Sequence, residues 1–309
     1  MLSRSTLIGA LVVVELAIVG LAAKALGGGP PSGAFGLSFP SFGGHAVATT
    51  TQLNRTFVAG LAPHVVIDVH DIDVVVETAN APAVRGVETV TKTGYTSGTV
   101  PELTAQQTPD GVRFHTTASA DTVTLGEFDR TLHVTVPAAA LVEISSAGRV
   151  DASGLRAKLV AHSPGGPIYV SDHRGDLDLS SSGGRIVLSN VQGGDIAAST
   201  HDGRLLFRRV GAERLDASSV DNYIEAVDLY AVDGALTTHS GHVDVSFTGD
   251  SDATVSARTD DGKVHVHGLA TTDDSRSSSV IHLGSGRGHF EVSTADGPVN
   301  ITRGANSHA

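Results

Sequence analysis

The stretch GRIVLSNVQGGDIAASTHDGRLLF, from Gly184 to Phe207, contains one short motif twice. Each copy has a glycine followed by two apolar residues in alternation, as in Gly184-Arg-Ile186-Val-Leu188 and Gly203-Arg-Leu205-Leu-Phe207. The motif begins at eight positions: Gly148, Gly166, Gly184, Gly203, Asn222, Gly241, Gly262 and Gly288. The successive spacings are 18, 18, 19, 19, 19, 21 and 26 residues, so the chain is a tandem repeat.

A second strand signal precedes most of these positions by seven residues. It is an apolar residue in each case: Leu159, Leu177, Ile196, Leu215, Val255 and Ile281. Each repeat therefore contains two short strands, which cannot bury their apolar residues alone but form a continuous core when the repeats stack. The sequence thus predicts an all-β, single-stranded β-solenoid, or β-helix, with coils of about 18–21 residues and a handedness left open.

The eight repeat positions are predicted to be the structural turns of the coils. A sharp turn with positive φ is least costly for glycine, which has no Cβ. Asn222 occupies one of these positions, and asparagine tolerates the left-handed conformation better than most residues. The open end of the last coil, near Val299 to Ile301, is predicted to expose a sheet edge that the last residues, another chain or a second copy would cover.

The composition excludes several classes of protein. Glycine accounts for 36 of the 309 residues without a G-X-Y period, which excludes collagen. Hydrophobic residues make up 40 %, too many for a disordered chain, and aromatic residues only 4 %. Cysteine is absent, so there is no disulfide framework and no cysteine-based metal or redox site. The net charge of −12 disfavours nucleic acid as a partner.

The segment Leu7 to Leu26, LIGALVVVELAIVGLAAKAL, is long enough to cross a bilayer, because 20 helical residues span about 30 Å. Arg4 and the amino terminus precede it, which favours a cytoplasmic amino terminus and export of the rest. Residues 1–26 are predicted to be an uncleaved anchor or, alternatively, a signal peptide cleaved at Ala23-Lys24-Ala25. The anchor is preferred, and it gives a single-pass protein of the cell membrane with an extracytoplasmic solenoid. Cleavage would make the protein secreted.

Glu15 lies near the middle of this segment, where a carboxylate costs a few kcal/mol and gains from a partner. It is the candidate contact with another membrane helix; the alternative is a protonated or snorkelling side chain. Residues 27–48 are rich in glycine and proline and are predicted to be a linker.

From residue 49 onward, apolar and polar residues alternate, as in Val65-Val-Ile67, which is typical of strands with one buried face. Residues 49–144 are predicted to form irregular N-terminal β coils of the same solenoid, with a separate β cap as the alternative. Residues 145–303 are predicted to be the regular solenoid, and residues 304–309 a tail.

Four segments carry a family resemblance: Phe57-Val58, Val65-Val66-Ile67-Asp68, Val74-Val75-Val76-Glu77 and Leu132-His-Val-Thr-Val136-Pro137. With the G-x-[IV]-x-[VL] coils that follow, they resemble the bacterial DUF4097 family of adhesin-like proteins over about residues 49–303, and the head-GIN group more weakly. The resemblance implies a β-solenoid attached to the bacterial envelope, without established catalytic residues. His70-Asp71-Ile72-Asp73 departs from the family, whose members often have a glycine-containing turn here.

Histidine is the main candidate metal ligand, with 15 copies. The best clusters are His239-Ser-Gly-His242, His265-Val-His267, and His282 with His289. His265 and His267 are expected to point outward, and His242 to approach His265 across neighbouring coils. Zinc would suit such a cluster. Without cysteine or a HExxH spacing, exposed strand histidines are the better interpretation, so no metal or cofactor is assigned.

Acidic and aromatic residues are the other candidates for a catalytic or binding site. The first strands carry a carboxylate cluster of Asp68, Asp71, Asp73 and Glu77. Paired carboxylates can hydrolyse glycosides or bind Ca²⁺, but solvated strand ends explain these better. The aromatic residues that could stack on sugars are Tyr169, Phe207, Tyr223 and Tyr230. The coils leave no spare length to wall a groove, and only Leu269–Ser279 is inserted, as a predicted surface loop. No catalytic residue is assigned.

These features predict a non-catalytic, adhesin-like scaffold or interaction module of the cell envelope, with a protein partner or self-association. Two alternatives stay open. One is a carbohydrate-active β-helix enzyme or a glycan-binding protein. The other is an envelope-stress sensor or regulatory accessory protein, coupled to its partner through the membrane helix.

Overall fold

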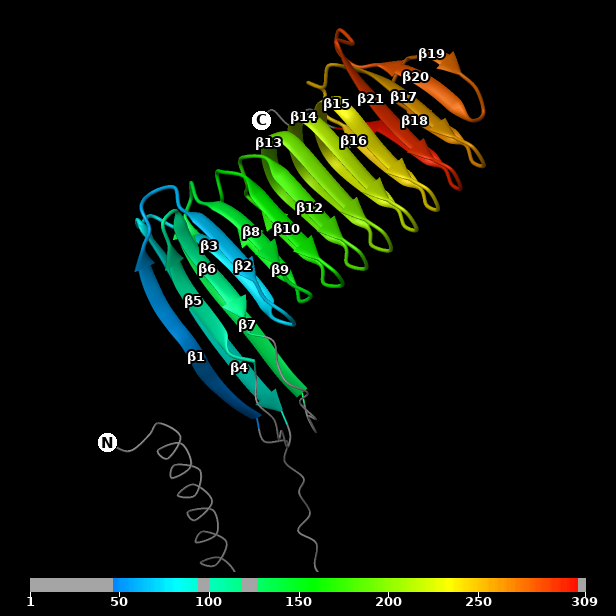
Figure 1. Ribbon diagram of the computed structural model, residues 1–309. Helices are drawn as coiled ribbons and strands as arrows, with labels where there is room; N and C mark the ends of the chain where they lie inside the picture. Colours follow the sequence, from blue (N-terminus) through cyan, green and yellow to red (C-terminus); the bar gives the residue numbers. More distant parts are fainter. Residues whose placement is uncertain (1–46, 94–100, 118–126, 305–309) are drawn as a thin grey trace, which may run out of the picture. The chain divides into compact units, whose positions relative to one another are not determined.

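Figure 1 shows the computed structural model, which describes residues 47–93, 101–117 and 127–304. These ranges belong to the compact unit His45–Ala309, whereas the predicted anchor, Glu15 and most of the linker lie outside the described residues. All regular elements in the described ranges are β strands, as predicted. Among these residues, no helix is long and apolar enough to cross a membrane.

The described ranges contain the following strands: β1 (Val47–Val58), β2 (His64–Asp68), β3 (Asp73–Ala79), β4 (Ala83–Thr93), β5 (Leu103–Thr108), β6 (Gly111–Thr116), β7 (Glu127–Pro137), β8 (Leu141–Ser145), β9 (Val150–Ser153), β10 (Leu159–Ser163), β11 (Ile168–Ser171), β12 (Leu177–Ser181), β13 (Ile186–Thr200), β14 (Leu205–Ser219), β15 (Ile224–Thr238), β16 (Val243–Phe247), β17 (Ala253–Thr259), β18 (Val264–His267), β19 (Thr271–Asp274), β20 (Ser278–His282), β21 (Gly288–Thr294) and β22 (Val299–Arg303).

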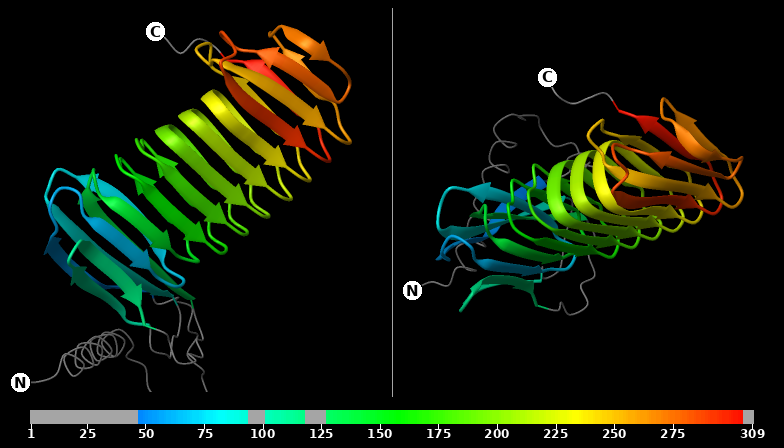
Figure 2. Two further views of the ribbon diagram at one scale, coloured as in Figure 1. Left: turned by 45° about the horizontal axis from the view of Figure 1, so that its top comes forward. Right: turned by 90° about the horizontal axis from the view of Figure 1, so that it is seen from above.

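Most strands stack in parallel to form the two faces of a solenoid (Figures 1 and 2). In the central coils, face A contains β10, β12 and the ends of β13, β14 and β15, whereas face B contains β9, β11 and the starts of β13, β14 and β15. Each coil contributes one strand to each face. In face B, Ile168, Ile186 and Leu205 are in register, so the spacings of 18 and 19 residues correspond to single coils.

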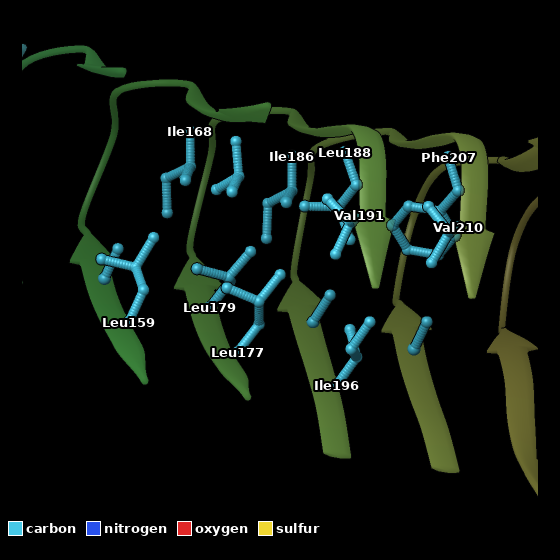
Figure 3. Close-up of a cluster of buried hydrophobic side chains, with 14 of the residues drawn as sticks. Leu159, Ile168, Leu177, Leu179, Ile186, Leu188, Val191, Ile196, Phe207 and Val210 are labelled. Carbon is cyan, nitrogen blue, oxygen red and sulfur yellow. The ribbon is translucent and has the colours of Figure 1, made fainter. Parts of the chain in front are cut away.

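The core lies between the two faces and consists mainly of aliphatic ladders (Figure 3). Leu177 pairs with Ile196 in face A and Ile186 with Leu205 in face B, and all four side chains are buried. Because each coil places an apolar residue at the same position as its neighbour, the coils bury each other's side chains. A narrow core of this kind needs few aromatic residues.

A buried hydroxyl occupies the corner between face A and face B in each central coil. Thr200 Oγ1 donates to the carbonyl oxygen of Gly184 in the preceding coil (3.1 Å) and accepts from the amide of Gly203 (3.0 Å). Equivalent hydroxyls donate to the preceding corner at Ser146, Ser163, Ser181, Ser219, Thr238, Thr259 and Thr294. These hydroxyls satisfy backbone groups that the corner would leave unpaired.

The corner glycines are required for a reason different from the one predicted. None of the repeat positions has a positive φ: Gly148, Gly166, Gly184, Gly203, Asn222, Gly241, Gly262 and Gly288. Instead, a Cβ on Gly184 would overlap the carbonyl oxygen of Gly166 in the preceding coil. The close approach of one backbone to the next therefore requires glycine here, and the expectation of left-handed turns at these positions was wrong.

The left-handed residues lie at the opposite corner, where the chain passes from face B to face A. Their φ angles range from 51° to 78°: Gly154, Asp172, Asn190, Arg209 and Asp228. Asn190 Nδ2 donates to Asp172 Oδ1 (3.0 Å), and Arg209 Nε donates to Asn190 Oδ1 (2.5 Å). These side chains connect consecutive coils, and short polar side chains tolerate the left-handed region better than most.

A buried histidine lies directly after one of these left-handed residues. The corresponding position in the neighbouring coils is apolar, with Leu155 before His173 and Val191 after it. His173 is only 1 % exposed. Burial lowers the pKa of His173, against a weaker opposing effect of the backbone at Asp176 and Gly175. The folded protein therefore favours the neutral imidazole.

We expect His173→Leu to stabilise the protein most at acidic pH. Because its pKa is lower in the folded than in the unfolded state, His173 costs stability as the pH falls through its ordinary value of about 6.5. Thermal unfolding of wild type and variant at pH 8, 6.5 and 5 measures the difference. The gap should widen towards pH 5, and replacement of the exposed His162 by Gln is the control for removal of a histidine elsewhere on the solenoid. A constant gap at all three values would contradict the assignment.

The last coil in the sequence is not the last coil in the stack. β21 pairs with β15 on one side and β17 on the other, and β22 pairs with β16 and β18. The expected open edge near Val299 to Ile301 is therefore wrong, because β22 is paired along both edges. The repeat assigned to Gly288 is also out of register: Gly288 begins β21 in face A, and Gly297 is the corner glycine that stacks on Gly241.

The inserted segment Leu269–Ser279 is not a simple surface loop. It contains β19 and the start of β20, which form an antiparallel hairpin. β20 also pairs antiparallel with β17, so the hairpin covers the outer edge of face A at this end (Figure 1). The extra length of this repeat therefore forms an end cap.

The amino-terminal end has the same reversed order. β2 pairs with β6 and β8, and β3 pairs with β7 and β9, so the coil formed by β2 and β3 is second in the stack. β6 and β7 form the outer coil, and antiparallel β5, β4 and β1 continue the two faces beyond it. Residues 49–144 thus contain both parallel coils and antiparallel strands.

A buried ion pair lies in this amino-terminal part. Arg130 Nε in β7 donates to Glu88 Oε1 in β4 at 2.9 Å, and Arg130 Nη2 donates to the carbonyl oxygen of Pro101 at 2.8 Å. Both side chains are at most 5 % exposed. Removal of either partner of a buried ion pair leaves the other charge without a counter-charge, and this lowers the stability of the fold.

Candidate functional site

Two of the histidine pairs that we expected to lie close together are separated in the structure. His242 and His265 do not approach across neighbouring coils, because β22 lies between β16 and β18. His282 in β20 and His289 in β21 lie on opposite sides of β17, since both are in register with Thr254. His265 and His267 are exposed, as expected. Their rings are parallel, with centroids 6.4 Å apart.

Two carboxylates with structural contacts are Asp73, one of the acidic candidates, and Asp252, which was not among them. Asp73 Oδ1 accepts from the backbone amide of Arg149 (2.8 Å) and so joins the coil of β2 and β3 to the next one in the stack. Asp252 Oδ2 accepts from Arg287 Nε (2.6 Å), and Asp252 Oδ1 accepts from the amide of Ser285 (2.7 Å). The bond from Arg287 is the main reason why the pKa of Asp252 lies well below its usual range. Asp68, Asp71 and Glu77 are exposed.

An outward-facing stripe of cationic and aromatic side chains runs beside the A-to-B corner across six consecutive coils. We call it the Arg–Tyr–His stripe, and it comprises Arg149, Tyr169, Arg185, Arg204, Tyr223 and His242. Five of its members directly follow a corner residue, as Arg185 follows Gly184, and Tyr169 is the third residue after Gly166. The strand register therefore places one member on each coil.

The first half of the stripe is organised around Tyr169. The guanidinium carbon of Arg149 lies 4.3 Å from the centroid of the Tyr169 ring, and that of Arg185 lies 5.3 Å from it. Arg185 Nε also donates to the Tyr169 hydroxyl at 2.8 Å. Arg149 Nε donates to Asp151 Oδ2 at 2.6 Å, and this bond is the main reason why the pKa of Arg149 is raised. Both guanidinium groups are thus held in place by the ring.

The second half is organised around Tyr223. Arg204 Nη1 donates to the Tyr223 hydroxyl at 2.8 Å, which is the main cause of the raised pKa of Arg204. The Tyr223 ring stacks on the His242 ring with centroids 4.7 Å apart and an angle of 10° between the planes. Arg204 lies over the same ring at 5.4 Å.

The stripe is suited to anions rather than to stacking on sugars. Cationic or imidazole side chains already lie against the Tyr169 and Tyr223 rings, so these rings are not free platforms. The other aromatic candidates lie elsewhere: Phe207 is 1 % exposed and belongs to the core, and Tyr230 is 38 % exposed. A planar guanidinium in a fixed position favours carboxylate or phosphate, which it can bind through two parallel hydrogen bonds.

Face A carries a second, weaker candidate. A depression of about 530 Å³ lies over β14, β15, β21 and β17, and its lining includes the hydroxyls of Ser218, Thr237 and Ser293. Arg258 and His239 also line it. Its hydroxyls can bind polar groups, but no pair in it has the cation–aromatic contacts of the stripe.

Residues 63–302 match the Toastrack DUF4097 family. The chain belongs to the Toastrack family. This match confirms the resemblance that the alternating strands and the G-x-[IV]-x-[VL] coils carry. A comparison with curated proteins found no match to this Toastrack chain.

Crystal structures similar to this Toastrack chain include the following three. A candidate adhesin from Parabacteroides merdae is 14 % identical over 82 % of this chain and 95 % of its own, with a TM-score of 0.48. A candidate lipid-binding protein from Parabacteroides distasonis is 11 % identical over 82 % and 96 %, with a TM-score of 0.44. A candidate cell adhesion protein from Clostridium sporogenes is 8 % identical over 84 % and 100 %, with a TM-score of 0.28.

Sequence reasoning missed the arginines of the stripe, although a signal for them exists. An arginine directly follows the corner glycine in three of the coils, at Arg149, Arg185 and Arg204. Two of the four aromatic candidates, Tyr169 and Tyr223, do lie in the stripe. Their role differs from the one considered, because they hold cations.

Proposed function

We propose that this Toastrack chain is a non-catalytic, adhesin-like interaction module of the bacterial cell envelope. In this proposal residues 1–26 anchor it in the cell membrane, residues 27–48 serve as a stalk, and the solenoid lies on the extracytoplasmic side. The apolar length of Leu7 to Leu26 and the positive charge before it support the anchor. Glu15 would then contact a partner helix in the membrane.

The Arg–Tyr–His stripe is the observation that carries the proposed binding activity. Its arginines lie on the first, third and fourth of the six coils, which are about 4.8 Å apart, so they form a line along the stack. A linear acidic polysaccharide carries carboxylates or phosphates along its length and would lie along that line. The net charge of −12 makes the rest of the surface unfavourable for such a polymer, which confines binding to the stripe.

The test uses fluorescently labelled alginate oligomers, as an acidic polysaccharide, and labelled dextran, as a neutral one. We expect the full-length protein in mild detergent to bind alginate, with affinity falling as salt rises, and to bind dextran far more weakly. The double variant Arg185→Gln/Arg204→Gln should lose at least about tenfold in affinity, since each arginine contributes a charge-assisted bond. Fluorescence anisotropy measures all of these affinities.

Arg258→Gln is the matched control, because Arg258 is an exposed arginine paired with Glu291 on face A. It should leave alginate binding unchanged. Equal binding of dextran, or an equal loss in the Arg258 variant, would instead favour the depression on face A and a neutral glycan, the second candidate function. Absence of alginate binding by the wild type would contradict the proposal.

A further inference from the structure

The tip of the A-to-B corner, formed by the two residues between the buried hydroxyl and the corner glycine or asparagine, differs from coil to coil. In two neighbouring coils the tips are His201-Asp202 and Val220-Asp221. Other coils make the same corner with Pro164-Gly165, Ser182-Gly183 and His239-Ser240. Because glycine and serine also serve there, the corner itself does not require the two aspartates.

The fold holds the two aspartates one above the other. The amide of Asp221 donates to the carbonyl oxygen of His201 at 2.9 Å, which fixes Asp221 one coil beyond Asp202 in the equivalent position. His201 Nδ1 lies 2.7 Å from Asp202 Oδ1. Each of the three side chains offers one ligand atom, and these three atoms lie within 4.8 Å of one another. Two carboxylates this close repel each other unless a cation lies between them.

We propose that His201, Asp202 and Asp221 bind a divalent transition-metal ion, with Zn²⁺ as the best-fitting case. One imidazole nitrogen and two carboxylate oxygens are ligands that zinc accepts, and water would complete a four-coordinate site. Calcium and magnesium bind oxygen ligands and gain nothing from the imidazole. This site shares no residue with the stripe and goes beyond the proposed function.

The three side chains are exposed, and this determines how the site works. Because they are exposed, small changes of side-chain torsion can bring the ligand atoms from within 4.8 Å of one another to the shorter separations around a zinc ion, whose bonds are about 2.0–2.2 Å long. The backbone that carries them is fixed by the coil-to-coil hydrogen bonds. The bound ion would therefore join two consecutive coils at their corner and stabilise the stack.

The experiment titrates Zn²⁺ into chelator-treated full-length protein by calorimetry, for the wild type and for His201→Gln and Asp221→Asn. Each variant should weaken one zinc-binding event by at least about tenfold. The control is His239→Gln, an exposed histidine in the same corner position two coils further on, which should leave that event unchanged. Thermal unfolding in Zn²⁺ should show a stabilisation that both site variants lose.

Four results would overturn the proposal. The first is a wild type that binds no zinc, and the second is a loss of affinity in His239→Gln equal to that in His201→Gln. The third is a Ca²⁺ affinity that exceeds the Zn²⁺ affinity and survives His201→Gln. The fourth is retention of the zinc-dependent stabilisation by both site variants.

Discussion

Gly184→Ala should unfold the solenoid or lower its unfolding free energy by more than about 3 kcal/mol. The added Cβ would overlap the carbonyl oxygen of Gly166 in the preceding coil. That oxygen cannot move freely, because it also accepts from the buried Ser181 hydroxyl (3.3 Å), which in turn accepts from the amide of Gly184 (2.9 Å). A displacement at one corner therefore breaks bonds in two coils.

Gly183→Ala is the matched control in the neighbouring position. A Cβ there would have its nearest neighbour, the carbonyl oxygen of Gly165, at 4.0 Å, and Gly183 does not have a positive φ. We expect a change within about 0.5 kcal/mol, measured by urea unfolding followed by circular dichroism. Similar stabilities for the two variants would show that backbone stacking is not what requires glycine at position 184.

Arg130→Met should cost about 3–5 kcal/mol, because it leaves Glu88 as an uncompensated charge in the interior. Glu88 is 1 % exposed, so water cannot replace the lost guanidinium without opening the structure. The carbonyl oxygen of Pro101 would lose its bond from Arg130 as well. Urea unfolding of wild type and variant measures the effect.

Two comparisons separate loss of the buried pair from loss of an arginine in general. The double variant Glu88→Met/Arg130→Met removes both charges and should recover most of the lost stability, since a buried pair can often be replaced by apolar residues. Arg258→Met breaks an exposed pair with Glu291 and should change stability little. A double variant as unstable as Arg130→Met alone would contradict this account.

The repeat was predictable because stacking in parallel register makes coil length visible in the sequence. From Gly148 to Gly241 the spacing stays at 18 or 19 residues, and each step is one coil in the structure. Beyond Gly241 the spacings of 21 and 26 residues indicated that the coils become irregular, but not that the order of the strands changes. The order of strands there depends on pairings between distant segments, such as β15 with β21, which no local pattern encodes.

The candidate site was predictable only in part, for a similar reason. Tyr169 and Tyr223 were visible as aromatic residues on outward positions, but the position of Tyr169 relative to its corner differs from that of Arg149 and Arg185. Only the stacking of coils brings the three side chains together. The buried Ser and Thr hydroxyls were missed because, in a sequence, a hydroxyl before a glycine is an ordinary turn residue.

The reversed coil order at both ends has a consequence for how proteins of this kind can vary in length. The coil of β2 and β3 is inserted between β6–β7 and β8–β9, and the coil of β21 and β22 between β15–β16 and β17–β18, so each end is interlocked. The coils between the two ends are joined in simple succession. Duplication or deletion of such a coil would leave both interlocked ends intact and change the distance between these ends by about 4.8 Å. The length of the solenoid is therefore set by the number of whole coils between its two ends.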